Sequence, residues 1–558
     1  MFANIPARFL PPERSLPQLT FGAPWLHYAH SRSRLNATEE LLDTVIARLG
    51  ADRPAIHEVA TARTWSYGEF QEAVNQLGNA LLGLGLKPGE RVFLRLPDCP
   101  EMAIAQLAVW KVGGVIVPSS VLERSREITF MINDTEAALA IVGSDHAAEL
   151  ETARSGCSTL REVVSVPGPG ADGFANLLGR QSSTLEAYPN APLDASGIYY
   201  TGGTTGHPKG CLHTHIAEVA LADLTLLTRA AGPDDVFFTH APIGHAFGNG
   251  EKINFPFRAG AAVIYADRPT PVEMFDFSER FGATVLAGAA TMYRMMLRQT
   301  PDPMVAFPNL RFRSALSSGE ILDRPTQDRW EEIFGFPLRN VVGMTPMRHI
   351  FLDANVLGVK RAPGLSVGTP LPGYEARLVD AETGEPAAPG AAGRLAMRGP
   401  TGITYWCNLH PFIRERAERD VQGGWSLLDD AYERDEEGWL WFSSRLDDMI
   451  VTGGRQVAAP EVEAVLAEHQ AVAECAVIGV ADSLRGQVVR AVVVLRDGFT
   501  ADAEMVEVLQ EHAKRLMAPY KYPRQIEFRR ELPKDHVGKL QRRRLREEAL
   551  AAQDSKSD

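Results

Sequence analysis

Residues 201–210, Thr-Gly-Gly-Thr-Thr-Gly-His-Pro-Lys-Gly, contain four glycines, three threonines and one lysine. Glycine lacks a Cβ atom, so the backbone can turn tightly and direct successive N–H groups at an anion. Threonine hydroxyls add further donors, and Lys209 adds a mobile cation that suits a phosphate. A surface turn is also rich in these residue types, but it needs neither the threonines nor the lysine. The segment therefore predicts a phosphate-binding loop. It is not a GxxxxGKS/T loop, because His207-Pro208 separates Gly206 from Lys209.

The elements that must position this loop follow a regular alternation. The apolar run at 197–200 predicts a strand that ends in the loop. Upstream, apolar residues around Val74 recur at helical spacing. They are followed by a predicted strand at 91–96, a predicted helix at 100–111 and a predicted strand at 115–117. Repeated strand–helix units predict an α/β domain with a largely parallel sheet that is covered by helices.

The character of the sequence changes near residues 445–454. Beyond this point the patterns predict a compact α+β unit of about 100 residues, which is a normal domain size. Its predicted elements are a helix at 460–468, strands at 472–480 and 488–495, a helix at 503–516 and a strand at 525–528. We therefore expect a large α/β domain followed by a small α+β domain.

Composition excludes several classes of protein. The 558 residues suffice for two or more domains, and 45% apolar with 23% charged residues is ordinary for a globular enzyme. A net charge of −13 argues against general binding to nucleic acids or membranes. No apolar run is long enough to span a bilayer, and the N-terminus does not resemble a signal peptide. The five scattered cysteines predict reduced thiols in a cytoplasmic protein, not a zinc site or disulfides.

The glycine–threonine segment fits, at every position, the pattern Ser/Thr-Ser/Gly-Gly-Ser/Thr-Thr-Gly-x-Pro-Lys-Gly. It thus resembles the phosphate-binding loop of the adenylate-forming superfamily, which includes acyl-CoA synthetases, luciferases and the adenylation domains of peptide synthetases. The resemblance implies two half-reactions. A carboxylate attacks the α-phosphate of ATP to give acyl-AMP and pyrophosphate, and a thiol, usually that of coenzyme A, then displaces AMP. Mg²⁺ is implied together with ATP and coenzyme A.

The resemblance also implies where the two domains meet. The hinge of the family is the first aspartate of Gly-Arg-x-Asp-Asp, which appears here as Ser-Arg-Leu-Asp-Asp, so Asp447 is the predicted pivot. The large ATP- and acyl-binding domain would span residues 1–446, and the small, mobile C-terminal domain would span residues 447–558.

Three catalytic residues are implied: Lys209, His245 and Lys539. Lys539 lies in residues 533–542, which resemble the Pro-x-x-x-x-Gly-Lys ending of the family. In the family this lysine bridges the carboxylate and the α-phosphate. A solvated lysine in a basic tail is the alternative, but the upstream phosphate loop favours the catalytic interpretation. His245 matches a position that lines the acyl pocket and controls entry of the carboxylate, although a lone histidine is more often structural.

Other positions match residues that bind the substrates in the family. Asp430 and Arg445 match the ribose-binding pair, Ser318-Gly319-Glu320 matches a loop that packs on the adenine, and Gly453-Gly454 matches the passage for the pantetheine arm of coenzyme A. Plain turns and loop acids are the competing explanations. The predicted nucleotide- and cofactor-binding residues are Thr201, Gly202, Gly203, Thr204, Thr205, Gly206, Ser318, Gly319, Glu320, Thr345, Asp430, Arg445, Gly453 and Gly454. The predicted acyl-pocket residues are His245, Phe247, Ala289, Ala290 and Ser317.

Two segments depart from the family pattern. The motif Tyr-Gly-x-Thr-Glu appears as Val-Gly-Met-Thr-Pro at 342–346, so a proline replaces the glutamate that ligates Mg²⁺ in the family. No metal-ligating residue is therefore predicted, and phosphate oxygens and water would hold Mg²⁺. The motif Thr-Gly-Asp appears as Leu428-Asp429-Asp430.

Nearly the whole chain resembles the bacterial benzoate and 2-aminobenzoate CoA ligase branch, through segments such as 347–351 and 518–523. This implies an ATP-dependent aryl-acid CoA ligase whose partner is a small aromatic carboxylate, acting as a monomer or homodimer. Two alternatives stay open. One is an acyl-AMP ligase that loads a carrier protein. The other, motivated by Pro346 and Leu428, is a degenerate member that binds nucleotide or aryl acid with little adenylation.

Overall fold

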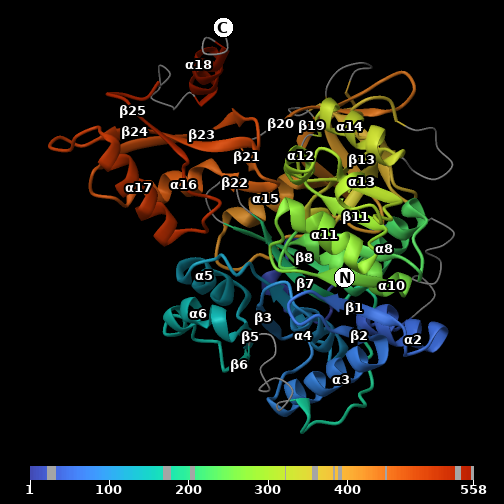
Figure 1. Cartoon of the computed structure of the whole chain (residues 1–558). Coiled ribbons are helices and arrows are strands. Elements are labelled where there is room, and N and C mark those ends of the chain that lie inside the picture. The colour runs from blue at the N-terminus through green and yellow to red at the C-terminus, as the bar shows by residue number, and fades with distance from the viewer. Residues whose placement is uncertain are drawn as a thin grey trace.

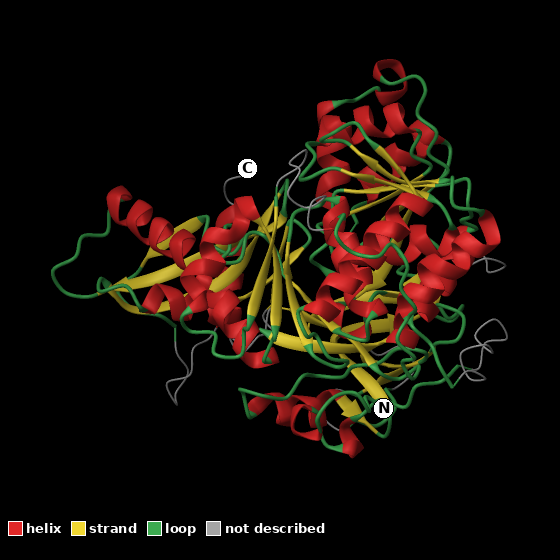
Figure 2. Cartoon of the chain, turned by 90° about the horizontal axis from the view of Figure 1, so that it is seen from below, coloured by secondary structure: helices red, strands yellow, loops and turns green. Residues whose placement is uncertain are grey.

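The computed structural model of the chain describes residues 1–21, 33–167, 178–201, 208–320, 322–354, 362–380, 384–387, 393–445, 449–533 and 542–554. Figure 1 shows a large body and, at its side, a smaller C-terminal lobe in orange to red. We call the residues of the lobe from 449 onward the small lobe. Sheets flanked by helices build the body (Figure 2), and the predicted α/β class with a small C-terminal unit is confirmed. The predicted boundary at Asp447 lies outside the described residues and stays a prediction.

The first large sheet positions the two ends of the predicted phosphate loop. Its six strands lie in the order β6 (Glu162–Val166), β5 (Leu139–Gly143), β3 (Arg91–Arg95), β4 (Val115–Pro118), β7 (Ala195–Thr201) and β8 (Lys209–Thr214). All neighbours pair in parallel except β7 and β8, which pair antiparallel with Thr201 opposite Lys209. The loop residues 202–207 lie outside the described residues, but their two anchors are side by side.

The second large sheet has nine strands and a parallel centre. The order is β15 (Thr369–Pro370), β14 (Ile350–Asp353), β13 (Leu338–Gly343), β12 (Ser314–Ser317), β11 (Val285–Gly288), β9 (Val236–Thr239), β10 (Ala262–Tyr265), β1 (Pro54–Glu58) and β2 (Thr64–Ser66). Strands β13 to β1 run parallel to one another, and the outer strands are antiparallel. The carboxyl ends of the parallel strands therefore meet along one edge, where open α/β sheets bind ligands.

A third sheet completes the body, and a fourth forms the small lobe. The third contains β16 (Glu375–Val379), β17 (Gly393–Arg398), β19 (Trp425–Arg434), β18 (Val421–Gln422) and β20 (Leu440–Arg445). The fourth contains β22 (Arg455–Ala458), β21 (Met449–Thr452), β24 (Gly486–Leu495), β23 (Val472–Asp482) and β25 (Gln525–Phe528). In the lobe, α16 (Ala459–Ala467) and α17 (Ala503–Leu516) share an apolar core with this sheet, and α18 (Arg542–Asp554) packs on β23.

Most helices of the body cover the two large sheets. Some of them begin where a side chain caps the first turn, as in α3, where Ser66 and Glu69 form a reciprocal capping box. Helix α4 is buried on all sides, with its apolar residues inside the main core, so its sequence is apolar without a polar face. Among the described residues, no helix is both long and apolar enough to cross a membrane.

The helical segments are η1 (Ala7–Phe9), η2 (Glu13–Ser15), η4 (Glu39–Asp43), α2 (Thr44–Leu49), α3 (Tyr67–Gly83), α4 (Pro100–Lys111), α5 (Ser125–Thr135), η5 (Ser144–His146), α6 (Ala147–Arg154), α8 (His215–Arg229), α9 (Ala246–Asn249), η6 (Gly250–Asn254), α10 (Phe255–Ala259), α11 (Pro271–Phe281), α12 (Ala290–Gln299), α13 (Pro303–Ala306), α14 (Arg324–Phe334), η7 (Thr345–Met347) and α15 (Phe412–Asp420).

Candidate active site

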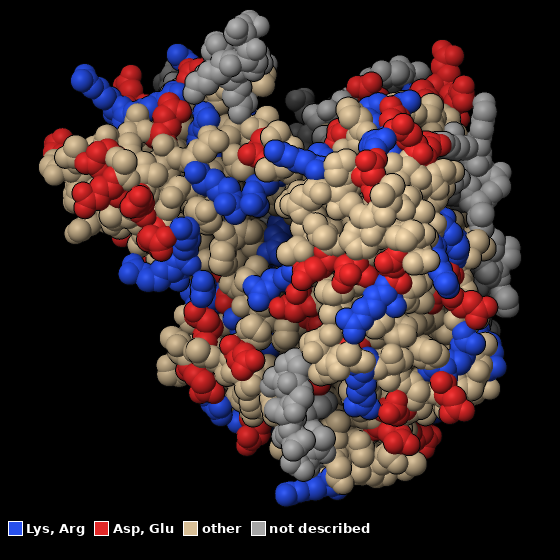
Figure 3. Space-filling view, in the orientation of Figure 1, with Lys and Arg blue, Asp and Glu red and all other residues tan. Residues whose placement is uncertain are grey.

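A cavity of about 370 Å³ lies where the small lobe meets the large body. Much of its wall comes from residues that directly follow strands of the nine-stranded sheet: His240 after β9, Ala289 after β11, Ser318 after β12 and Met344 after β13. Figure 3 shows the surface hollowed between body and lobe. The size of the cavity is typical of a small-molecule site, and its place at the carboxyl edge of the sheet is the expected one.

The cavity brings together residues that are far apart in the sequence. Thr201 and Pro208, at the two ends of the predicted phosphate loop, line it from the six-stranded sheet. The small lobe supplies Arg455, Tyr520 and Lys521. Nine of the residues predicted from the sequence also line the cavity: Thr201, His245, Phe247, Ala289, Ser318, Gly319, Thr345, Gly453 and Gly454.

Two glycine-containing turns touch where the lobe meets the body. Gly454 adopts φ 73°, and a Cβ atom at this position would lie 2.9 Å from the Cβ of Ala289. Gly319, with φ 84°, faces the backbone oxygen of Gly454, 3.4 Å from where its own Cβ would be. Because both residues have a left-handed backbone, a side chain at either would be strained, and at Gly454 it would also clash with Ala289. Glycine at these positions allows the two turns to pack closely.

Lys209 begins β8 and is buried, with 6% of its surface exposed. Burial lowers its pKa, and the nearby charge of Arg416 lowers it further, whereas Asp429 and Asp420 oppose the shift. Among the described residues, its ammonium group donates no hydrogen bond. A cation that is desolvated without a close carboxylate is well suited to an anionic ligand.

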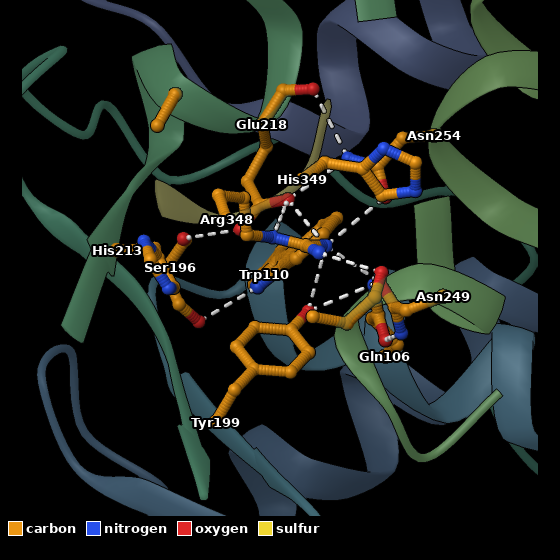
Figure 4. A network of polar contacts seen from close by, with 12 residues as sticks. Gln106, Trp110, Ser196, Tyr199, His213, Glu218, Asn249, Asn254, Arg348 and His349 are labelled. Carbon is orange, nitrogen blue, oxygen red and sulfur yellow. Dashed lines mark hydrogen bonds and ion pairs between the residues drawn. The ribbon is translucent and has the colours of Figure 1, made fainter. Parts of the chain in front are cut away.

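Arg348 lies at the centre of the buried polar network in Figure 4. Its guanidinium donates to both carboxylate oxygens of Glu218, at 3.0 and 2.9 Å, and neither side chain is exposed. It also donates to the Tyr199 hydroxyl at 2.9 Å, to Asn249 Oδ1 at 2.7 Å and to the Ala246 carbonyl at 3.1 Å. Arg348 has φ 71°, a backbone conformation that is unfavourable for a residue with a side chain. These bonds hold the strained residue in place.

The network joins the elements that surround the cavity. Tyr199 belongs to the strand before the phosphate loop, Glu218 to α8, and Asn249 to α9. Two histidines extend this network of hydrogen bonds. His213 Nε2 donates to the carbonyl of Thr345 at 2.9 Å, and His349 Nε2 donates to the carbonyl of Phe247 at 3.2 Å. Elements that line the cavity from different parts of the chain therefore share one buried support.

Part of the cavity lining is apolar and includes neutral histidines. Phe247, Met292 and Ile350 form this part together with His240 and His245. Burial lowers the pKa of both His240 and His245 to about 3, and the charge of Arg455 acts in the same direction. Neither imidazole forms a hydrogen bond with a described residue. At neutral pH these rings are uncharged groups that can donate or accept a bond from a ligand.

Two family profiles match the chain. The "AMP-binding enzyme" family matches residues 42–406, and the "AMP-binding enzyme C-terminal domain" matches residues 461–539. The first match covers more than half of the chain.

The chain belongs to the AMP-binding enzyme family.

Relatives of this AMP-binding enzyme match along almost their whole length. A benzoate–CoA ligase of Thauera aromatica is 34% identical over 523 residues, which cover 92% of this chain and 96% of the relative. A 3-hydroxybenzoate–CoA ligase of Aromatoleum sp. is 31% identical over 92% of this chain and 97% of its own. The crystal structure of the anthranilate CoA ligase AuaEII in complex with anthranoyl-AMP superposes with a TM-score of 0.69 at 31% identity, over 94% and 99% of the two chains. The predicted superfamily is confirmed, as is the predicted enzyme class, because these relatives are acid–thiol ligases.

Several predicted residues of the AMP-binding enzyme do not line the cavity. Ala290 is fully buried in an apolar cluster with Tyr293 and Trp330. Ser317 is fully buried at the end of β12. Glu320 accepts a hydrogen bond from the Thr291 hydroxyl at 2.8 Å and pairs with Arg294 at 3.1 Å, while burial raises its pKa. Their proposed roles in ligand binding stay predictions.

The predicted ribose pair is in register on the third sheet. Asp430, 9% exposed on β19, lies opposite Arg445 on β20, so the two backbones are adjacent. Lys539 and Asp447 lie outside the described residues, as do Gly202, Gly203, Thr204, Thr205 and Gly206 of the phosphate loop.

The residues of the site do not fit a metal ion that the protein itself would hold. Pro346 offers no side-chain oxygen, and the Thr345 hydroxyl is the one side-chain oxygen of η7. Among the described residues, no three His, Cys, Asp or Glu side chains gather into a cluster that could hold a metal. We therefore regard Mg²⁺ as part of the ATP substrate and assign it no ligand.

Sequence reasoning missed Arg348, His240 and Lys521. Arg348 pairs with Glu218, 130 residues away, and Lys521 pairs with Glu127, 394 residues away. A single sequence carries no local signal for such pairs. His240 directly follows a strand whose carboxyl end reaches the sheet edge where the cavity lies. Open α/β sheets bind ligands at this edge, so the position of His240 after the strand could have identified it as a candidate site residue.

Two buried histidines predict how the free energy of unfolding falls at acid pH. Burial lowers the pKa of His213 and of His215 to about 3, whereas an unfolded histidine titrates near 6.5. The unfolded chain binds protons below pH 6.5 that the folded chain does not. Stability is therefore full above this pH and is lost as the pH falls toward 3. Each histidine should lower the free energy of unfolding by about 1.4 kcal/mol per pH unit between pH 5.5 and 4.

Urea unfolding at several pH values would measure this loss, with His215→Gln as the test variant. Nδ1 of His215 accepts a bond from the Ala37 N–H at 3.1 Å, and the Gln amide oxygen can replace this acceptor. The variant should show a pH slope that is shallower by about 1.4 kcal/mol per unit. Equal slopes for the wild type and the variant would contradict the prediction.

Proposed function

We propose that this AMP-binding enzyme is an ATP-dependent aryl-acid CoA ligase that acts through an aryl-AMP, with 2-aminobenzoate or benzoate as the acid. The observation that carries the proposal is the cavity itself. It joins the ends of the phosphate loop, an apolar part with neutral histidines, and a glycine turn of the small lobe. Each of these parts would serve one substrate: ATP, the aryl acid and coenzyme A.

In the first half-reaction, a carboxylate oxygen of the acid attacks the α-phosphorus of ATP. The new O–P bond forms as the bond to pyrophosphate breaks, so no net oxidation or proton transfer is needed. Because two anions approach each other, cations and hydrogen-bond donors must offset the charge. Thr201, Thr204, Thr205 and Lys209 would hold the β- and γ-phosphates, and Lys539 would bridge the carboxylate and the α-phosphate. Asp430 and Arg445 would hold the ribose.

In the second half-reaction, the sulfur of coenzyme A attacks the acyl carbon of aryl-AMP. A C–S bond forms, the C–O bond to AMP breaks, and the thiol proton leaves to solvent. The long pantetheine arm needs a narrow path to that carbon. Gly453 and Gly454 would border this path, since side chains there would fill it.

The size and character of the cavity favour a small aromatic acid. Phe247, Met292 and Ile350 offer apolar faces to a ring. The uncharged imidazoles of His240 and His245 would not draw a second carboxylate into this part, so a monocarboxylic acid suits it better than a dicarboxylic acid. An amino substituent could bond to an imidazole without a change of charge.

ATP–pyrophosphate exchange, measured with Mg²⁺ and a panel of aromatic and aliphatic acids, tests the proposal. We expect exchange with benzoate or 2-aminobenzoate, and AMP release when coenzyme A is added. Exchange with AMP release only in the presence of a carrier protein would favour the carrier-loading alternative. Absence of exchange with every acid would refute the ligase.

The replacement of Pro346 by glutamate should increase the sensitivity of the enzyme to Mg²⁺. A carboxylate at this position would add a charged oxygen ligand next to the nucleotide. The Mg²⁺ concentration for half-maximal pyrophosphate exchange should then fall by about tenfold. Pro346→Gln, which adds a neutral oxygen, is the matched control. If the wild type binds ATP without exchange and only Pro346→Glu restores exchange, the chain is a degenerate member of the family instead.

A further inference from the structure

A buried cluster of charges crosses the boundary between the body and the small lobe. Lys521 comes from the lobe, where its Nζ donates to Glu461 Oε1 at 2.8 Å. Across the boundary it donates to Glu127 Oε1 on α5 at 2.6 Å, and Glu123 Oε2 lies 4.0 Å away. Lys521 is 5% exposed, Glu127 8% and Glu461 9%. Because water is excluded, this contact is stronger and more sensitive to geometry than a surface ion pair.

The carboxylate that accepts the Lys521 hydrogen bond on the body side is held in place by a contact within the body itself. Glu127 Oε2 accepts the backbone N–H of Arg124 at 3.0 Å and so caps the first turn of α5. The cap fixes the carboxylate, which leaves Oε1 directed at Lys521. Burial raises the pKa of Glu123, and the charge of Glu127 raises it further. A fixed acceptor that faces a lysine from another lobe has the form of a docking point.

The docking point forms part of the wall of the cavity. Glu123, Glu127 and Lys521 all belong to the cavity wall, together with Gly453 and Gly454. One further ion pair, between Arg126 and Glu468, also crosses the boundary, while within the lobe the Arg455 guanidinium lies 4.6 Å from the centre of the Tyr520 ring. The Arg126–Glu468 pair is largely exposed, so it contributes little. Within the part of the chain that the structure describes, Lys521 thus provides a buried link between the body and the small lobe beside the cavity.

We propose that Lys521 is a positioning residue for the second half-reaction. Its pair with Glu127 docks the small lobe so that the Gly453–Gly454 turn borders the cavity. This inference rests on the proposed function, because it assigns that turn to the path of coenzyme A. The first half-reaction is assigned instead to Lys539, a different residue of the sequence, so the loss of the Lys521 pair should affect the two half-reactions unequally.

Lys521→Met and Glu127→Gln would each break the link. Glutamine can still cap α5, so Glu127→Gln removes only the charge. This variant therefore tests the link even if Lys521→Met fails to fold. The matched control is Lys514→Met, which breaks an exposed pair with Glu511 on α17 of the same lobe. Thiol transfer from supplied aryl-AMP to coenzyme A should slow by about tenfold or more in both link variants. Pyrophosphate exchange should stay within about twofold of the wild type, as should both rates in the control.

The pattern of rate constants separates docking from other roles. A docking residue lowers kcat of thiol transfer, whereas a residue that binds coenzyme A directly raises KM at unchanged kcat. The second pattern would overturn the proposal, as would equal losses in both half-reactions.

Hydrogen exchange of the backbone amides gives a readout that does not depend on activity. Amides at the start of α5 and in residues 453–455 should exchange faster in Lys521→Met than in the wild type and in Lys514→Met. Unchanged exchange would refute the docking role. If no acid supports pyrophosphate exchange, the proposed function fails, and hydrogen exchange still decides whether Lys521 docks the lobe.

Discussion

Arg348→Met should lower the free energy of unfolding of the large body by about 3–5 kcal/mol, because it leaves the carboxylate of Glu218 buried and without its cation. Both side chains are fully buried, and Glu218 keeps only its neutral donors, Ser196 and Asn254. Methionine also frees the Tyr199 hydroxyl and Asn249 from the same guanidinium. Unfolding in urea, followed by tryptophan fluorescence, would report the shift, since Trp110 lies in the same network (Figure 4).

Two further variants separate the charge from the packing. Arg348→Met combined with Glu218→Met replaces the whole pair with apolar groups and should recover a large part of the lost stability. Arg324→Met breaks the exposed pair with Asp328 and should cost at most about 1 kcal/mol. If Arg348→Met and Arg324→Met were equally mild, the buried pair would not support the site as we describe it.

Lys539→Met should slow ATP–pyrophosphate exchange by a factor of about 10²–10³, which is the usual loss when one donor to a developing anion is removed. Lys539 lies outside the described residues, so this expectation rests on the sequence pattern of residues 533–542. The rate of thiol transfer from supplied aryl-AMP should not change, because in that step no carboxylate attacks the α-phosphate of ATP. The variant is therefore the counterpart of Lys521→Met, with the opposite half-reaction impaired.

The control for Lys539 is Lys534→Met, which removes the same charge from the same segment five positions earlier. It should leave pyrophosphate exchange within about twofold of the wild type, because a cation that does not touch the reacting groups contributes little. If both lysine variants lost exchange equally, general attraction of ATP to a basic segment would explain the result better than a catalytic lysine.

Elements with a strong local pattern were predictable to within a residue or two. Helix α4 begins at Pro100, since proline favours the first turn, and ends before Gly113 at φ 80°. The prediction at 100–111 is therefore confirmed, as are those of α17 and β25. Strands β23 and β24 extend two residues beyond their predicted spans, because the tight turn between them continues the pairing.

The third sheet and the supports of the site were not predictable in this way. Strands β16 to β20 pair across loops of varied length, and two-residue strands such as β18 have no period to detect. The phosphate loop was predicted by residue type and stays a prediction, since only its anchors, Thr201 and Lys209, are described. Arg348 gave no local signal because an arginine is buried only where distant partners converge on it. Motifs reveal the groups that meet a ligand, whereas the groups that hold them depend on the folded chain.

The Arg348 network has a consequence for anyone who redesigns this enzyme for another acid. Met292 and Ile350 border the cavity without taking part in that network, so they can be exchanged for smaller or larger residues at modest risk. His349 is different, because its ring is fixed by Phe247 and its backbone follows a strained arginine. Libraries aimed at new substrates should therefore vary the apolar faces and leave the buried charges intact. The fold thus separates the apolar residues that border the cavity from the residues that keep it in shape.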